Sequence, residues 1–337
     1  MRPRQHCVLF IVAFLVAFSG IFTPAHAETS KVRVATQFGL AYLPLIVMEH
    51  DKLWEKQAAA LGQAITAEYA RLGGGATLND ALISGSVDMV AGGTAPMLVL
   101  WDKTRGSLKV EAVAALNASP MDILTNKPGI KTLADLKPDD RIAVPAVRVS
   151  LQALALMAAC EKQFGAGHAG ELDNRTVSMQ HPDALTALVV RSGPISTYVS
   201  SSPYQEMALK KPGISKITDS FAAFGGRSTF SVVYAKDAFV ANNPKVTAAF
   251  YAALREAMAS IAADPKAAVG KYLEVTHERT DRALLEEILA RPDFTFGVEP
   301  QSTLALAQLM QRVGLIKTKP TSWKDYFAAP LHGGEGS

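Results

Sequence analysis

Cysteine is scarce in this chain of 337 residues, which contains only Cys7 and Cys160. Cys7 falls in a leader segment that we expect to be removed, so the remaining chain has no partner for an intrachain disulfide. Cys160 stands in the apolar stretch LQALALMAACEKQF, where a free cysteine usually acts as a small core residue and less often as a catalytic one. A chain of this length can bury enough apolar surface to fold without disulfides.

The sequence also lacks the motifs of common enzyme classes. It has no G-x-S-x-G elbow, no H-E-x-x-H pair and no Walker loop. A G-x-G-x-x-G pattern occurs at Gly165, Gly167 and Gly170, but it follows an expected helix, whereas a dinucleotide loop follows a strand and opens a helix. We therefore expect no enzyme activity, no catalytic residue, no cofactor and no metal site.

Charge of one sign does not dominate. The chain has 34 basic and 31 acidic residues and a net charge of +3. No cluster of lysines and arginines with interleaved aromatic residues occurs, which excludes the usual nucleic-acid-binding pattern. An anionic ligand would therefore be held by local dipoles and at most an arginine, not by a basic surface.

Long apolar runs are limited to the N-terminus. Val8–Phe22 follows Arg2 and Arg4, and the run ends in the small residues of TPAHA, which closes at Ala27. A positive start, an apolar segment and an A-x-A ending are typical of a secretory signal peptide, and the run is short for a membrane span. We predict cleavage after Ala27 and a soluble, monomeric protein exported to the periplasm.

Beyond the leader, strand and helix patterns alternate, which indicates an α/β fold. The expected strands are 31–36, 64–69, 87–91, 108–116, 121–125, 141–145, 176–180, 195–200 and 229–235. The expected helices are 43–57, 76–84, 95–103, one starting after Ser150, 183–191, 243–265 and 280–290. Two α/β lobes with a helical C-terminal tail are predicted, and a cleft is expected where strand ends run into helix N-termini.

One stretch, GGGATLNDALISGSVDMVAGG at residues 73–93, has glycines at both ends. Gly73, Gly74 and Gly75 can take positive φ and let another group approach their N–H donors. A strand, a glycine turn and a helix N-terminus together suit anion capture. The alternative is a tight connection without a ligand, and the stretch alone does not separate the two.

Several stretches in order resemble the nitrate/sulfonate/taurine family of solute-binding proteins that serve ABC transporters. They are VRVATQFGLAYLPLIVMEHDKLWEK, GGGATLNDALISGSVDMVAGG, GIKTLADLKPDDRIAVP, HPDALTALVVRSGPISTYVSSSPYQE, NPKVTAAFYAALREAMASIAADPKAA and GLIKTKPTSWKDYF. The chain departs from the family pattern at residues 138–140 and 194–196. The resemblance implies a type II periplasmic-binding fold with a two-crossing hinge near 117–120 and 220–224. Lobe one would be 28–117 plus 222–337, and lobe two 118–221.

The resemblance also implies which residues line the cleft. The first lobe would contribute Gln37, Phe38, Tyr42, Gly75, Ala76, Thr77, Thr94, Ala95 and Asn117. The second would contribute Arg148, Val149, Ser150, His181, Ser202 and Tyr204. Simpler roles stay open: packing for Phe38 and Tyr42, helix capping for Thr94 and Ser150, a structural role for His181, and surface exposure for Arg148 and Arg227.

The function implied is capture of a small anion, sulfonate-like or carboxylate-like, and its delivery to ABC permease subunits. Helix N-termini at Ala76, Ala95 and Ser150 would present positive ends to the ligand. Ligand would drive closure through its higher affinity for the closed state. Two alternatives are a ligand-binding component of a sensory system and a binding protein related to thiamine-pyrimidine synthesis.

Overall fold

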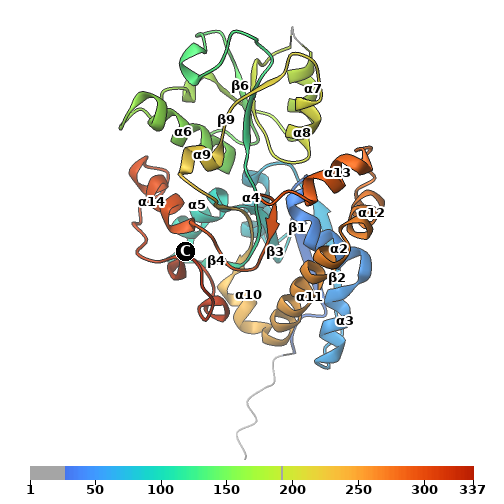
Figure 1. Cartoon of the computed structure of the whole chain (residues 1–337). Helices are drawn as coiled ribbons and strands as arrows, with labels where there is room; N and C mark the ends of the chain where they lie inside the picture. Colours follow the sequence, from blue (N-terminus) through green and yellow to red (C-terminus); the bar gives the residue numbers. More distant parts are fainter. Residues whose placement is uncertain (1–26, 191–192) are drawn as a thin grey trace, which may run out of the picture.

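The computed structural model describes residues 27–190 and 193–337, so the expected signal peptide lies outside the described residues up to position 26. The chain folds into two α/β lobes, each around its own β-sheet, with lobe two above lobe one in Figure 1. In this part of the chain no helix combines the length and apolarity that crossing a membrane requires. The predicted two-lobe α/β architecture is confirmed.

Lobe one contains a six-stranded sheet in the order β11-β4-β10-β3-β1-β2. Its strands are β1 (Lys31–Thr36), β2 (Thr66–Arg71), β3 (Met89–Gly93), β4 (Val110–Ala118), β10 (Thr229–Lys236) and β11 (Thr295–Phe296). Its helices are α2 (Leu43–Asp51), α3 (Leu53–Ala60), α4 (Gly75–Ser84), α5 (Thr94–Thr104), α10 (Asp237–Asn242), α11 (Pro244–Ala263), α12 (Pro265–Thr276), α13 (Arg282–Leu289) and α14 (Thr303–Arg312). β1 is parallel to β2 and β3, whereas β10 runs antiparallel between β3 and β4.

Lobe two contains a five-stranded sheet in the order β7-β6-β8-β5-β9. Its strands are β5 (Asp122–Thr125), β6 (Ile142–Val144), β7 (Thr176–Ser178), β8 (Thr197–Val199) and β9 (Ser215–Asp219). Its helices are α6 (Leu151–Phe164), α7 (His181–Val189), α8 (Tyr204–Leu209) and α9 (Ser220–Phe224). β6 is parallel to β7 and β8, so all three carboxyl ends lie at one edge of the sheet.

The chain passes between the lobes after β4 and again between α9 and β10. Beside the crossings, within lobe two, the chain is bonded together: the Met121 N–H donates to the Ser220 hydroxyl and the Ser220 N–H donates to the Met121 carbonyl, each at 2.9 Å. Helix α9 itself packs against α6 of lobe two. The two stretches of chain that enter and leave lobe two are therefore held together.

An apolar contact between α5 and α6 also joins the lobes. Leu151, Leu154 and Ala158 of α6 are buried in the same hydrophobic cluster as Met97 and Trp101 of α5. The rest of lobe two has two smaller cores of its own. The main core thus continues from lobe one into the N-terminal half of α6.

Local sequence signals explain where α4 and α6 begin and end. Ser150 caps α6, since its hydroxyl accepts from the Ala153 N–H at 3.2 Å. Gly85 ends α4 in the left-handed conformation at φ 76°, which favours glycine. Cys160 is a buried free thiol, and burial raises its pKa to about 12, as suits a core residue. Gly165 and Gly167 of the G-x-G-x-x-G pattern follow α6 in a loop, so the pattern does not have the strand-turn-helix context of a dinucleotide-binding loop.

Candidate functional site

The carboxyl edges of the two sheets face each other and are in contact. The Leu40 N–H of lobe one donates to the Ser202 carbonyl of lobe two at 3.2 Å. A Cβ added to Gly93 at the end of β3 would lie 3.6 Å from the Cβ of Leu151. We refer to this contact zone, formed by the loops after β1, β2 and β3 against those after β6, β7 and β8, as the interlobe seam.

The glycine turn before α4 lies at the centre of the seam. A Cβ at Gly73 would overlap the side-chain amide of Gln180, and a Cβ at Gly74 would lie 3.4 Å from the Pro145 carbonyl. Gly74 has φ 80°, where glycine is favoured over other residues. Two of the glycines therefore allow lobe one to touch lobe two closely.

Gly75 has a different neighbour. A Cβ there would lie 2.7 Å from ring carbons of Pro96 on α5, within the same lobe. Ala76 and Thr77, the next two residues of α4, are exposed. The bare backbone at Gly75 thus serves helix packing, whatever further part this turn has in binding.

The side chain of Gln37 covers the N-terminus of α4. With its amide oriented to satisfy both ends, the oxygen accepts from the Gly74 N–H at 3.3 Å and the Gly75 N–H at 3.1 Å. Its nitrogen then donates to the hydroxyl of Tyr42 at 2.8 Å. Two backbone donors of the predicted anion site are consequently held by a neutral amide of the protein.

Tyr42 and Phe38 also contribute to packing. Tyr42 is buried, and burial raises its pKa above the ordinary value for a tyrosine. Phe38 is half-buried and packs against the lobe-two cluster that contains Tyr198 and Tyr204. Phe38 therefore places an aromatic ring across the interlobe seam.

Thr94 and Ala95 are buried at the start of α5. The N-cap is Gly93, and the Thr94 hydroxyl donates to the Thr229 carbonyl of β10 at 2.9 Å, so the capping role considered for Thr94 is wrong. Asn117 is also satisfied by protein groups: its amide nitrogen donates to the Thr295 carbonyl at 2.9 Å and its oxygen accepts from the Ser119 hydroxyl at 2.7 Å. Asn117 thus fixes the first crossing segment.

Residues 148–150, in the loop before α6, have different structural roles. Ser150 caps the helix and also donates to the Ala146 carbonyl at 2.8 Å. Arg148 has φ 61°, is exposed, and pairs with Asp173 at 3.1 Å. The pair lies in a depression that is also lined by residues 167–171 and by Arg312. Val149 is half-buried. The guanidinium of Arg148 is therefore directed to a carboxylate of its own lobe.

His181 is the centre of a buried polar cluster in lobe two. Its Nε2 lies 3.2 Å from the amide nitrogen of Gln152 and 3.1 Å from the Ser201 hydroxyl, and its Nδ1 contacts the Tyr198 hydroxyl. Because the Gln152 nitrogen can only donate, we assign Nε2 as the acceptor and the ring proton to Nδ1. Burial lowers the pKa of His181 to about 4, so the ring is neutral near pH 7.

Tyr204 stacks on His181, with ring centroids 5.4 Å apart and planes within 12°. Its hydroxyl reaches Glu278 of lobe one at 3.4 Å, and Glu278 also accepts from Tyr272 at 2.9 Å. Burial raises the pKa of Tyr204. The His181 cluster is thus connected across the seam to lobe one.

Helix α8 makes a second polar bridge between the lobes. Glu206 pairs with Arg291 of lobe one at 2.7 Å and accepts from the Ser202 hydroxyl at 2.7 Å. Arg291 also binds Asp293 through two hydrogen bonds of 2.9 and 2.8 Å. Sequence reasoning found Ser202 but missed Glu206 and Arg291, because no local pattern marks a pair separated by 85 residues.

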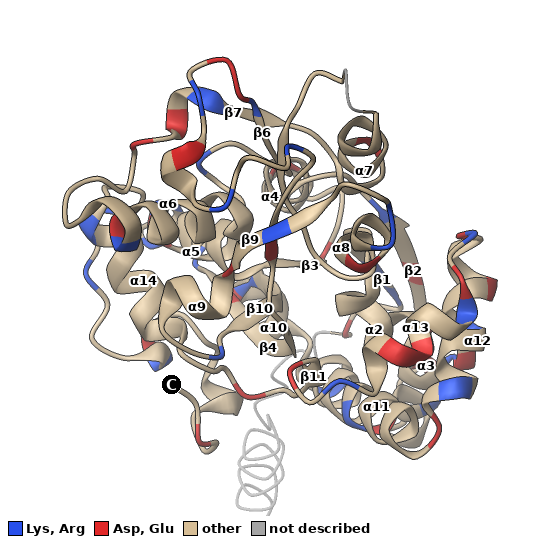
Figure 2. Ribbon diagram, turned by 45° about the horizontal axis from the view of Figure 1, so that its top comes forward, with Lys and Arg blue, Asp and Glu red and all other residues tan. Residues whose placement is uncertain are grey.

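Charged side chains beside the seam are paired, as Arg291 is with Glu206 and Asp293. His181 is neutral, Arg148 is paired with Asp173, and Arg227 donates to the Pro292 carbonyl at 2.7 Å from an exposed loop. Over the described ranges 27–190 and 193–337, no group of three or more His, Cys, Asp or Glu residues is arranged to hold a metal ion. In the view of Figure 2, basic and acidic residues are interspersed over both lobes.

This architecture of two α/β lobes joined by paired crossings is that of the periplasmic binding proteins. The model of the NMT1-like family matches residues 25–272, and the chain belongs to this family. No curated protein sequence matches the chain. The family match and the solved structures below confirm the expected resemblance in family and fold.

Solved structures show the same fold. An alkanesulfonate-binding protein from Xanthomonas axonopodis pv. citri, bound to MOPS, is similar with a TM-score of 0.71 and 18% identity over 90% of this chain and 100% of that one. The ligand-binding component of an ABC-type import system from Staphylococcus aureus, with zinc bound, has a TM-score of 0.68 and 18% identity over 90% and 98%. The periplasmic nitrate-binding protein from Synechocystis PCC 6803 has a TM-score of 0.67 and 13% identity over 89% and 84%.

Proposed function

We propose that this protein is an exported, periplasmic solute-binding protein that captures a small organic anion at the interlobe seam and delivers it to an ABC importer. The observation that carries the proposal is the turn at Gly73 and Gly74, where lobe one meets Gln180 and Pro145 of lobe two. A ligand held at this turn contacts both lobes at once. The folds of the alkanesulfonate-binding and nitrate-binding proteins support the same class of ligand.

The donors available to an anion are neutral. The Gly74 and Gly75 N–H groups lie at the positive end of α4 and are now bonded to the Gln37 amide oxygen. A sulfonate or carboxylate oxygen can take the place of that amide oxygen and form charge-assisted hydrogen bonds. The half-buried Phe38 supplies apolar surface for the organic part of the ligand.

Lobe movement connects binding with delivery. We place one hinge segment at 117–120 and the other after α9, at 225–228 rather than at the expected 220–224, because α9 packs on α6 of lobe two. The lobes we propose are then 28–117 plus 225–337 and 118–224. Two hydrogen bonds between Met121 and Ser220 hold together the stretches of chain beside the hinge. Ligand shifts the population toward the closed form by its differential affinity, and the closed form is the species presented to the permease.

The experiment is a ligand screen on the mature protein by thermal shift and calorimetry against sulfonates, carboxylates, nitrate, taurine and thiamine precursors. A true ligand raises the apparent stability by mass action. We expect a plain sulfonate or carboxylate to bind one per monomer without being converted. Stabilisation by neutral or cationic compounds alone would refute the anion class, and turnover of the ligand would refute a pure binding role.

A charge variant makes the test specific to the seam. Gln37→Glu puts a carboxylate on the Gly74 and Gly75 donors, which preserves the cap of α4 but repels an anion. We expect anion affinity to fall at least tenfold with an unchanged circular dichroism spectrum. The exposed Gln163→Glu on α6 carries the same charge change and should bind normally. Equal affinity in Gln37→Glu and wild type would place the ligand elsewhere.

A further inference from the structure

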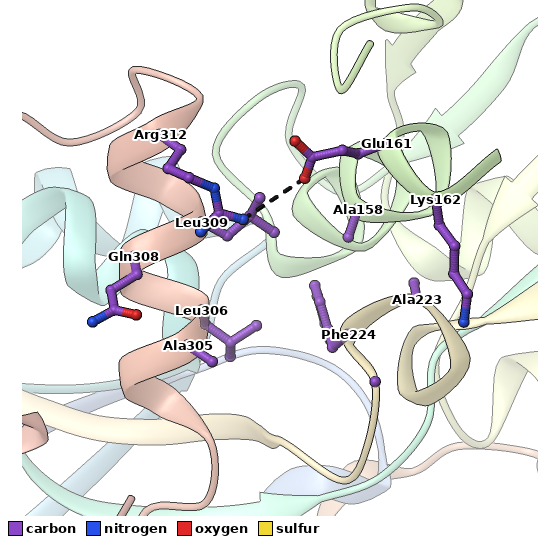
Figure 3. A pocket seen from close by; sticks show the side chains of 11 residues that line it. Ala158, Glu161, Lys162, Ala223, Phe224, Ala305, Leu306, Gln308, Leu309 and Arg312 are labelled. Carbon is purple, nitrogen blue, oxygen red and sulfur yellow. Dashed lines mark ion pairs between the residues drawn. The ribbon is translucent and has the colours of Figure 1, made fainter. Parts of the chain in front are cut away.

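A cavity of about 460 Å³ lies between α14 of lobe one and helices α6 and α9 of lobe two. None of its lining residues belongs to the interlobe seam or to the His181 cluster. Figure 3 shows α14 on one side, with Leu306 and Leu309 directed toward Ala158, Ala223 and Phe224 on the other. The volume is within the range of small-molecule sites. We refer to it as the α14 cavity.

Its walls come from both lobes, and most of their apolar residues belong to or pack against the main hydrophobic cluster. The N-terminal half of α6 packs on α5, where Leu151 and Leu154 join the main core. Toward its C-terminus α6 faces α14 instead, and Ala158 there lines the cavity opposite Leu309. Leu306 and Leu309 are already buried, so the apolar area that an occupant would remove from water belongs mainly to the half-buried Phe224 and Ala223.

The charged residues that line the cavity have a net positive charge. Arg312 and Lys162 stand on opposite walls, and Glu161 is the single carboxylate among the lining residues. Within the described ranges, the Arg312 guanidinium has one ion pair, to Glu161 at 3.7 Å, which is longer than a hydrogen bond. The Lys162 ammonium donates to the Ala222 carbonyl at 2.9 Å. A guanidinium has five N–H donors, so Arg312 keeps donors for an anionic group.

We propose that the α14 cavity is a second binding site, which takes a compact amphipathic anion such as an aryl sulfonate or aryl carboxylate. The apolar body packs between Leu306, Leu309 and Phe224, and the anionic head pairs with Arg312. Because the cavity is lined by both lobes, an occupant stabilises their present arrangement relative to an open one. The site shares none of its lining residues with the interlobe seam.

The test uses anilinonaphthalene sulfonate as a fluorescent probe with calorimetry on the mature protein. Ala305 is exposed on α14 and lines the cavity, so Ala305→Trp fills it without disturbing the core. We expect Ala305→Trp to weaken probe binding at least tenfold and Arg312→Gln to weaken it several-fold with a smaller salt dependence. The exposed α11 variants Ala262→Trp and Arg255→Gln are matched controls and should bind like wild type.

The seam variant separates this proposal from the function proposed above. Gln37→Glu should leave probe binding at the α14 cavity unchanged even if it abolishes binding of the seam ligand. Probe binding that is lost in Gln37→Glu but unchanged in Ala305→Trp would overturn the second site. A screen that finds no seam ligand, with probe binding still sensitive to Ala305→Trp, would refute the proposed function alone.

Discussion

The buried neutral His181 makes the stability of this protein depend on pH in a predictable way. Its folded-state pKa is about 4, against an ordinary value of 6.5, because burial disfavours the imidazolium. Between these values the unfolded chain holds a proton that the folded chain does not. Stability therefore falls as the pH drops from 6.5 to 4, by about 3 kcal/mol in total for a difference of this size.

Asp122 has the opposite effect over much of the same range. It is buried near Lys216, and burial raises its pKa from 3.8 to about 6, so the folded chain holds this proton more tightly than the unfolded one. Its contribution to stability is present at low pH and is lost as the pH rises through 6. The wild-type profile between pH 4 and 6 is thus the difference of two opposed terms, and only a comparison of variants isolates His181.

We therefore predict the pH dependence of the difference between wild type and His181→Asn. An asparagine amide can replace the Nδ1 donor to Tyr198 but does not gain a proton. Urea unfolding at a series of pH values should show that wild type loses about 3 kcal/mol relative to the variant between pH 7 and pH 4. The exposed His168→Asn serves as the control. A constant difference across this range would show that His181 is not held neutral by burial.

Three further outcomes are expected. Gly75→Ala should lower the free energy of unfolding by about 1–3 kcal/mol, because the added Cβ would lie 2.7 Å from Pro96. The control Gly106→Ala faces open space and should unfold in urea like wild type. Equal unfolding midpoints for the two variants would refute the packing role of Gly75. Arg291→Gln breaks the 2.7 Å ion pair between the lobes, from Arg291 to Glu206. It should weaken the affinity for the seam ligand about tenfold and enlarge the radius of gyration measured by X-ray scattering. If both stay unchanged, the ion pair does not hold the lobes closed. Cys160 should resist thiol reagents until the protein unfolds, because it is buried with a pKa of about 12; rapid labelling of native protein would contradict this.

Elements with a clear local pattern could be predicted from the sequence. The strand expected at 31–36 is β1 (Lys31–Thr36), and the helix expected at 76–84 is α4 (Gly75–Ser84), with Gly85 as its end. β9 (Ser215–Asp219) and β11 (Thr295–Phe296) were missed. β9 is short, carries Lys216 and Asp219, and lies at the edge of its sheet, so it lacks the apolar alternation that marks a strand.

Side-chain partners within the candidate site could not be predicted in this way. His181 bonds to Gln152 and Ser201, which are 29 and 20 residues away, and these separations follow from how α6, α7 and β8 pack. Gly75 illustrates the same limit, since the sequence correctly marks a place for bare backbone but not that Pro96 fills it. Hydrophobic periodicity fixes which face of an element is buried, whereas the partner depends on tertiary packing.

The Gln37 amide changes the physical account of anion selectivity. Two unoccupied N–H donors at a helix N-terminus would bind any acceptor, including water. Here the ligand must replace the hydrogen bonds of 3.3 and 3.1 Å that the Gln37 amide oxygen already accepts from these donors. In the function we propose, a neutral acceptor gains almost nothing by this exchange, because it swaps one neutral hydrogen bond for another. A charged oxygen forms bonds roughly twice as strong, which corresponds to about 1 kcal/mol for each of the two donors. The exchange alone then favours an anion over a neutral analogue by about 30-fold, before any contribution from a cation such as Arg291 is counted.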